Sequence, residues 1–273
     1  MNEQEVNLIE KESNDFTNYI TLEYMKKDRK ILALVLLLFG MLIITLLTLI
    51  FGLSLHTPNN SGKNYDFFGV YEVEIYSQTK VKIINPKASK NYTLFINDKK
   101  SALDEEGFFT FNYSGRHLVK ITFNDIPNYE QMFKDCSNLT RINYLNISSC
   151  PDCNSAEEMF SGCKRLQMIK TLDLKTDNIV DMSNMFSHAE SLTSLNLASF
   201  NTKSVQNMSS MFKECHNLKY LDIINFITTD STDVNDMFKN ACSDMKVCFN
   251  NDTAAKIGEA LPETMSRECL KTN

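Results

Sequence analysis

The most regular feature of this chain is a repeated pattern of apolar positions between residues 127 and 245. The dipeptide Met-Phe occurs five times, at intervals of 26 or 27 residues, beginning at Met132, Met159, Met185, Met211 and Met237. A small residue follows three places after each Phe. A period of this length lies in the range of about 20 to 29 residues used by leucine-rich repeats. The pattern therefore predicts a solenoid in which the repeats stack and share one core.

Each repeat contains two different periodicities. Before the Met-Phe dipeptide the apolar residues step by three, as in Val205, Met208 and Met211, which is typical of a helix. After the dipeptide they alternate, as in Leu221 and Ile223, which indicates a short strand. Ser and Thr residues precede the apolar stripes and suit helix N-caps. The sequence thus predicts strand-turn-helix units and an α/β solenoid.

The sequence of residues 182–223 is MSNMFSHAESLTSLNLASFNTKSVQNMSSMFKECHNLKYLDI. It resembles the repeats of BspA-like leucine-rich-repeat surface proteins of bacteria and protists. The resemblance covers about residues 127–245 and weakens at the ends, where Cys153 and Ala156 replace the Val and Met columns and Cys242 is one residue extra. It implies a leucine-rich-repeat solenoid displayed outside a cell, with no shared catalytic residues.

The regions on either side of the repeats have their own patterns. Residues 68–126 hold five short alternating runs separated by turn residues, which predict a small antiparallel β-sheet. We expect this module to cover the N-terminal end of the solenoid, where the first repeat would otherwise expose apolar surface. Residues 246–273 break the repeat pattern and are expected to form a C-terminal cap with one short amphipathic helix at 253–261.

The N-terminal part of the chain predicts a membrane anchor. Residues 31–55 form 25 positions without a charge, long enough for a transmembrane signal-anchor helix. Four basic residues precede this stretch, so the positive-inside rule places residues 1–30 in the cytoplasm as a tail. Residues 56–67 then form a linker. These features predict a single-pass type II protein of the plasma membrane, and a cleaved signal peptide is the alternative.

Cysteines and glycosylation motifs agree with an outward-facing C-terminal part. All eight cysteines lie after residue 135, as expected on an oxidising side of a membrane. We predict a disulfide between Cys248 and Cys269, and Cys150 with Cys153 is a less certain pair. The second pair also fits a redox dithiol, but Cys153 occupies an apolar column, which favours packing. Asn-x-Ser/Thr motifs predict glycosylation, with the candidate acceptors Asn59, Asn91, Asn112 and Asn251.

The remaining composition favours a binding function. The net charge of −6 does not suggest a nucleic-acid partner, and the four histidines show no partner pattern. We expect no enzyme activity, no cofactor and no metal site. The residues between the strand leucines point outward and form two columns that predict a ligand-binding face: Arg141, Met168, Ser194 and Tyr220 in one, and Asn143, Lys170, Asn196 and Asp222 in the other.

The predicted function is therefore surface binding or adhesion toward an unknown protein or glycan. A structural surface-coat protein is the alternative. A membrane-tethered lumenal enzyme is the third possibility, and no catalytic motif supports it.

Overall fold

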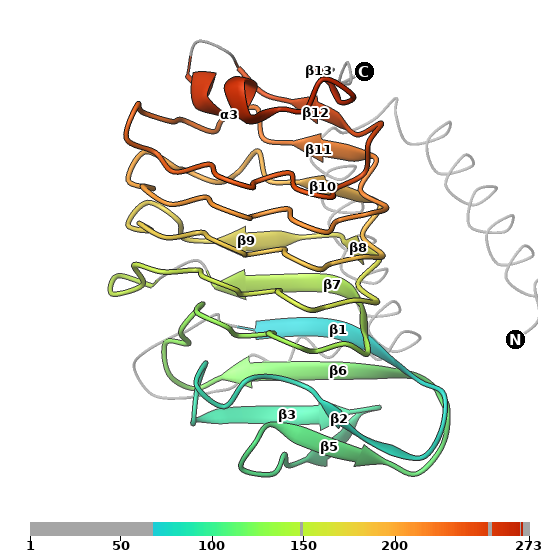
Figure 1. The fold of residues 1–273 in the computed structure, drawn as a ribbon. Coiled ribbons are helices and arrows are strands. Elements are labelled where there is room, and N and C mark those ends of the chain that lie inside the picture. Colours follow the sequence, from blue (N-terminus) through green and yellow to red (C-terminus); the bar gives the residue numbers. More distant parts are fainter. Residues whose placement is uncertain (1–67, 148–149, 251–252, 268, 270–273) are drawn as a thin grey trace, which may run out of the picture. The chain divides into compact units, whose positions relative to one another are not determined.

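A computed structural model describes residues 68–147, 150–250, 253–267 and 269. These residues form a β-solenoid whose strands stack from β7 toward β13, and an N-terminal sheet that contains β1, β3 and β6 extends the stack at the other end (Figure 1). The elements are β1 (Phe68–Ile75), β2 (Thr79–Lys82), β3 (Tyr92–Ile96), β4 (Lys99–Ser101), β5 (Phe108–Phe111), β6 (Gly115–Phe123), β7 (Leu139–Ile147), β8 (Met168–Ile169), β9 (Leu172–Leu174), β10 (Ser194–Asn196), β11 (Tyr220–Asp222), β12 (Lys246–Cys248), α3 (Ala255–Ala260) and β13 (Ser266–Arg267).

The N-terminal strands form an antiparallel sheet that joins directly onto the repeats. Its strand order is β4-β3-β6-β1-β7-β8, so β1 lies between β6 and the first repeat strand, β7. Along β1 every second residue is buried, which places Tyr71, Val73 and Ile75 in the core. A separate two-stranded ladder of β2 and β5 lies beside this sheet. The apolar core is therefore continuous from the N-terminal strands into the solenoid.

After β7, which has nine residues, the strands are only two or three residues long, and each pairs in parallel with the strand of the neighbouring repeat. The ladder β10-β11-β12-β13 keeps equivalent residues of successive repeats in register, with Leu195 beside Leu221 and Leu221 beside Val247. These three side chains are buried, whereas their neighbours on β10 and β11 are exposed or partly exposed. On β12 Lys246 is exposed, and Cys248 is buried in its disulfide. We call one full circuit of the solenoid, which contains one Met-Phe dipeptide, a rung.

Opposite the strands, each rung runs through a series of consecutive turns around its Met-Phe dipeptide. We call the stack of these segments the turn ribbon; it consists of residues 128–136, 155–163, 181–189, 207–215 and 233–241. Its amides alternate between two kinds of acceptor. The N–H of Met132 bonds within the rung to the carbonyl of Tyr129, whereas the next N–H, that of Phe133, bonds across to Met159. The alternation continues through Asp135 and Cys136 and recurs in the following rungs.

The α/β solenoid of strand-turn-helix units is therefore a wrong prediction. Within the described residues the one helix is α3, so the repeats are not leucine-rich repeats of that kind. An apolar step of three suits consecutive turns with hydrogen bonds to the third residue back, and those bonds are the ones present. Left-handed backbone interrupts any helix twice per rung, as at Asn184 with φ 54° and His188 with φ 58°.

A short polar side chain begins each ribbon segment and supports the first turn. The five residues occupy one column and are Asn128, Ser155, Asp181, Asn207 and Asp233. The side-chain oxygen of each accepts the backbone N–H two residues further on, at 2.7 to 3.1 Å. Such side chains favour turns because they bond their own neighbouring backbone.

Columns of identical apolar side chains fill the solenoid. The five ribbon Phe rings stack in pairs with centroids 5.2 to 5.9 Å apart and planes within 12° of parallel. The Met residues beside them are also buried. Tyr71 of β1 meets Phe133 edge-on at 5.3 Å and so begins the aromatic column at its N-terminal end. The Met-Phe signal is therefore a core signal, as the repeat analysis predicted.

The C-terminal end consists of one more strand of the parallel ladder, followed by the cap. β12 continues the parallel ladder of β11, although residues from 246 onward were predicted to lie in a cap. α3 follows within the predicted segment 253–261 and buries Ile257 against the last rung. The predicted disulfide between Cys248 and Cys269 is confirmed, and Cys150 and Cys153 are also bonded.

The membrane predictions require correction. In the part of the chain that the structure describes, no helix is both long enough and apolar enough to cross a bilayer. The predicted tail, span and linker (1–30, 31–55 and 56–67) lie outside the described residues. The spanning helix, the type II topology, the plasma-membrane location and the membrane partner are not supported, and we withdraw them.

Candidate ligand-binding surface

The outward side of the parallel strands brings the predicted face residues into two aligned columns. Arg141 pairs in register with Met168, and further along the stack Ser194 pairs with Tyr220. In the second column Asn196 pairs with Asp222. We call this surface the strand face. Its alignment follows from the 26-residue offset between rungs, because each rung places equivalent side chains at the same point of the circuit.

The members of the strand face differ in exposure. Met168 is 41% exposed, which is high for an apolar side chain, and Lys170, Ser194 and Asn196 are exposed as well. Arg141, Asn143, Tyr220 and Asp222 are partly buried. The face is thus a mixture of apolar, cationic and amide groups, with chemistry suited to a protein or a glycan ligand.

Some of these side chains also contact or hydrogen-bond neighbouring residues of the fold. The Arg141 guanidinium lies 3.2 Å from the sulfur of Met168, and the amide of Asn143 donates to the Glu72 carboxylate at 3.1 Å. The Asn196 and Asp222 side-chain oxygens each accept a backbone N–H two residues further on, at 2.9 and 3.1 Å. Substitutions on this face must therefore keep the turn acceptors if they are to test binding alone.

The structure extends the strand face beyond the predicted residues in both directions. Lys246 of β12 pairs in register with Tyr220 and so continues the first column. The 26-residue spacing from Tyr220 signals this position, but the predicted cap boundary excluded it. On the other side, Glu72 of β1 pairs with Arg141. That neighbour depends on antiparallel pairing between β1 and β7, for which the sequence contains no local signal.

Aromatic side chains gather where β1 meets the first rungs. Phe68 stacks on Tyr144 with ring centroids 4.8 Å apart, and Phe68 remains 37% exposed. Tyr76 is 64% exposed and carries the Arg165 guanidinium over its ring at 4.4 Å. Exposed aromatic and Arg side chains of this kind are enriched in interface cores. This end of the strand face is therefore its most apolar part.

A charged cluster borders the face at the other end. Lys219, next to Tyr220, pairs with the Asp244 carboxylate at 2.7 Å, and the Cys242 thiol donates to the same carboxylate at 2.9 Å. The hydrogen bond from Cys242, followed by that from Lys219, lowers the pKa of Asp244 to about 2. The cluster keeps a fixed charge pair on the rim at neutral pH.

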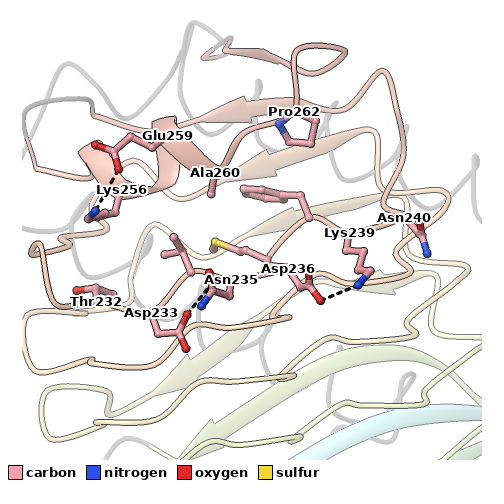
Figure 2. Close-up of a pocket in the computed structure, with 13 residues that line it drawn as sticks. Thr232, Asp233, Asn235, Asp236, Lys239, Asn240, Lys256, Glu259, Ala260 and Pro262 are labelled. Atoms are coloured by element: carbon pink, nitrogen blue, oxygen red, sulfur yellow. Dashed lines mark hydrogen bonds and ion pairs between the residues drawn. The ribbon is translucent and has the colours of Figure 1, made fainter.

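The structure also has a groove at the C-terminal end of the turn ribbon. One wall is formed by residues 232–240, which include most of the last ribbon segment, and the other by Lys256, Glu259 and Ala260 of α3 with Pro262 (Figure 2). The volume of this terminal groove is about 660 Å³, within the range of about 300 to 1,000 Å³ that is usual for ligand sites. Sequence reasoning did not find it, because it forms between a repeat and the cap.

The cysteines considered for chemistry are buried. Cys150 and Cys153 form a disulfide and are 4% and 6% exposed. Cys136, Cys163 and Cys215 are free and buried, and desolvation raises the pKa of Cys136 and of Cys215 to about 12. Burial of a thiol with a raised pKa suppresses its reactivity.

Two of the four predicted glycosylation acceptors lie in the part of the chain that the structure describes. Asn91 and Asn112 are exposed on the N-terminal sheet, and the Asn91 side-chain oxygen accepts the Asn124 amide at 3.0 Å. Asn59 and Asn251 lie outside the described residues. Glycosylation stays a prediction.

Comparison with known proteins links the repeats to one family model. Residues 154–256 match DUF285, described as a Mycoplasma protein of unknown function. No curated protein and no solved structure matches the chain. The matched segment begins at the second rung and ends within α3, so the similarity concerns the solenoid and part of its cap.

Proposed function

We propose that this chain is a surface-associated binding or adhesion protein, and that its strand face binds a protein or a glycan. The similarity of the repeats to BspA-like surface proteins and the match to DUF285 support the surface association. Two disulfides support an oxidising location. The proposed role is binding without catalysis.

The observation that carries the proposal is the alignment of the strand-face columns. Several rungs present Arg, Met, Lys and Tyr side chains in register on one surface. A ligand that spans more than one rung contacts several of them at once, so that modest individual contacts combine. The cost of ordering is low, because backbone hydrogen bonds between rungs already fix these positions.

Substitution of the face tests the proposal. The variant carries Arg141→Ala, Lys170→Ala, Tyr220→Ala and Asp222→Asn; the last change keeps an oxygen for the N–H of Ile224. The purified full chain is applied to a glycan array and to a panel of immobilised extracellular-matrix proteins. We expect at least one array member to bind the parent. We expect the variant to bind it roughly 100-fold more weakly, because a few central side chains usually dominate an interface.

A matched control changes exposed residues of the solenoid outside the strand face. The control variant is His188→Ala, Lys203→Ala and Gln206→Ala, and all three side chains are exposed. Circular dichroism and thermal melting establish that both variants keep the parent fold. A folded strand-face variant that binds as well as the parent, or a control variant that loses binding equally, contradicts the proposal.

A further inference from the structure

The last rung has a set of backbone N–H groups whose equivalents in the earlier rungs donate to the following rung. In rungs two to four, four alternate N–H groups of each ribbon segment donate to carbonyls of the following rung at 2.7 to 3.0 Å. The equivalent groups in the last rung are the N–H groups of Val234, Asp236, Phe238 and Asn240. No carbonyl or side chain among the described residues accepts a hydrogen bond from these four amides. They form a row with a spacing of two residues, as on an edge strand.

This row lies along the terminal groove. Val234, Asp236, Phe238 and Asn240 all line it, and α3 forms the opposite wall (Figure 2). α3 has only six residues and covers the apolar end of the core through Ile257. The core is thus capped while the backbone edge stays open. An open edge beside a groove is the geometry in which a peptide adds a strand to an existing sheet.

The charges of the groove favour a peptide over an anion. Lys239 pairs with Asp236 at 2.9 Å and Lys256 pairs with Glu259 at 3.2 Å, so these four charges cancel in two pairs. Asp233 adds one negative charge, which opposes an anionic ligand. Neutral peptide carbonyls are acceptors that suit the row of amides.

The inner rungs also specify one side chain of such a peptide. Asp181 uses one carboxylate oxygen for the N–H of Ser183 and receives the side-chain amide of Asn207 on the other, at 3.0 Å. Asp233 is the equivalent residue of the last rung, and one of its oxygens accepts the N–H of Asn235. An Asn in register with Asp233 would donate to its second oxygen.

We propose that the terminal groove binds a segment of a partner protein, which takes up the turn conformation of the ribbon and adds a further segment to it. Its alternate carbonyls accept the N–H groups of Val234, Asp236, Phe238 and Asn240, and an Asn donates to Asp233. The opposite end of the ribbon is partly covered by the N-terminal strands, which disfavours a second folded copy as the partner. There the N–H of Asn85 already donates to the carbonyl of Met132 at 2.8 Å.

A peptide from the chain itself provides a defined probe. The sequence of residues 205–214, VQNMSSMFKE, has no net charge. In the fold this segment accepts, on alternate carbonyls, the N–H groups of Met182, Asn184, Phe186 and His188. Hydrogen exchange of the full chain is followed by NMR or mass spectrometry with and without the acetylated, amidated peptide. We expect saturating peptide to slow exchange of the amides at 234, 236, 238 and 240 by roughly tenfold or more.

A second peptide tests the register. In this peptide Asp replaces the residue that corresponds to Asn207. Its carboxylate then lies against the carboxylate of Asp233. Loss of a hydrogen bond to a charged group corresponds to roughly tenfold or more in affinity, so we expect this peptide to bind at least that much more weakly. Equal affinity of the two peptides contradicts the register.

Two substitutions in α3 give a blocked groove and its control. Ala260→Arg places a long side chain in the groove, and Ala255→Arg makes the same change on the same helix at an exposed position outside it. We expect only Ala260→Arg to abolish peptide binding. The proposal fails if the peptide leaves the four amides unprotected in the parent, or if both variants bind the peptide equally well. If Ala260→Arg does not fold, the test rests on hydrogen exchange in the parent chain and on the affinity of the Asp peptide. Strand-face variants are expected to bind this peptide normally, which separates this site from the proposed function.

Discussion

Replacing one ring of the Phe stack tests how the solenoid is held together. Phe186 is fully buried, and Phe160 and Phe212 stack on its two faces with centroids at 5.2 and 5.9 Å. Truncation of a buried Phe to Ala costs about 3 to 5 kcal/mol of the free energy of unfolding. Each aromatic pair contributes about 0.5 to 1.5 kcal/mol beyond burial, so Phe186→Ala belongs at the upper end of that range.

Two control substitutions separate stacking from burial. Among the described residues Phe238 has one ring neighbour, Phe212, so Phe238→Ala should cost about 0.5 to 1.5 kcal/mol less than Phe186→Ala. Phe226 is equally buried but belongs to none of the ring pairs in the described residues. Phe226→Ala should therefore cost only the cavity and transfer terms.

Urea unfolding followed by circular dichroism measures these differences. The three variants are compared by midpoint and slope, because the linear extrapolation is valid only while the slope stays that of the parent. Hydrogen exchange then shows whether the last rung opens by itself in Phe238→Ala, as expected for an array stabilised by neighbouring repeats. A cost for Phe238→Ala or Phe226→Ala equal to that of Phe186→Ala would refute a stabilising role for the stack.

Three further substitutions or reactions test other features. Replacing Cys248 and Cys269 with Ala should lower the free energy of unfolding by about 2 to 4 kcal/mol, seen as a lower urea midpoint. Thr202→Val removes the oxygen that accepts the N–H of Ile227 at 2.7 Å, so we expect a loss of about 1 to 3 kcal/mol, and an unchanged melting temperature would contradict that role. Burial raises the pKa of Cys215 to about 12, so iodoacetamide at pH 8.5 should label it only after unfolding. Because its folded pKa lies above the unfolded value, stability from this thiol should fall as the pH rises above about 8.5, which pH-dependent urea midpoints would show.

The sequence predicts the repeat and its core because identical side chains contact one another between rungs. A column of Phe or Met at a 26-residue spacing is both the signal and the packing. The helix prediction failed because an apolar step of three is common to helices and to consecutive turns. The residues that force left-handed turns vary in type, as in Gln131, Glu158, Asn184, Ser210 and Asp236, so no single residue marks the position.

The sequence predicts less of the candidate sites. The two strand-face columns follow from the repeat alone, and the register places their residues side by side. The aromatic cluster at Phe68 and Tyr144 depends on β1 pairing with β7, two strands far apart in the sequence. The terminal groove depends on how the cap packs against the last rung. Both arise from nonlocal assembly, which no local pattern encodes.

The alternation of hydrogen bonds along the turn ribbon limits how such a protein can change in length. One residue inserted within a ribbon segment would exchange odd and even positions, so amides that reach the next rung would point into their own turn. The single extra residue that makes one offset 27 instead of 26 lies between Ile147 and Ser155, outside the ribbon, in the stretch that carries the Cys150–Cys153 disulfide. Gene duplication can therefore lengthen the array only in whole rungs, whereas that corner accommodates one extra residue without a change of register in the ribbon.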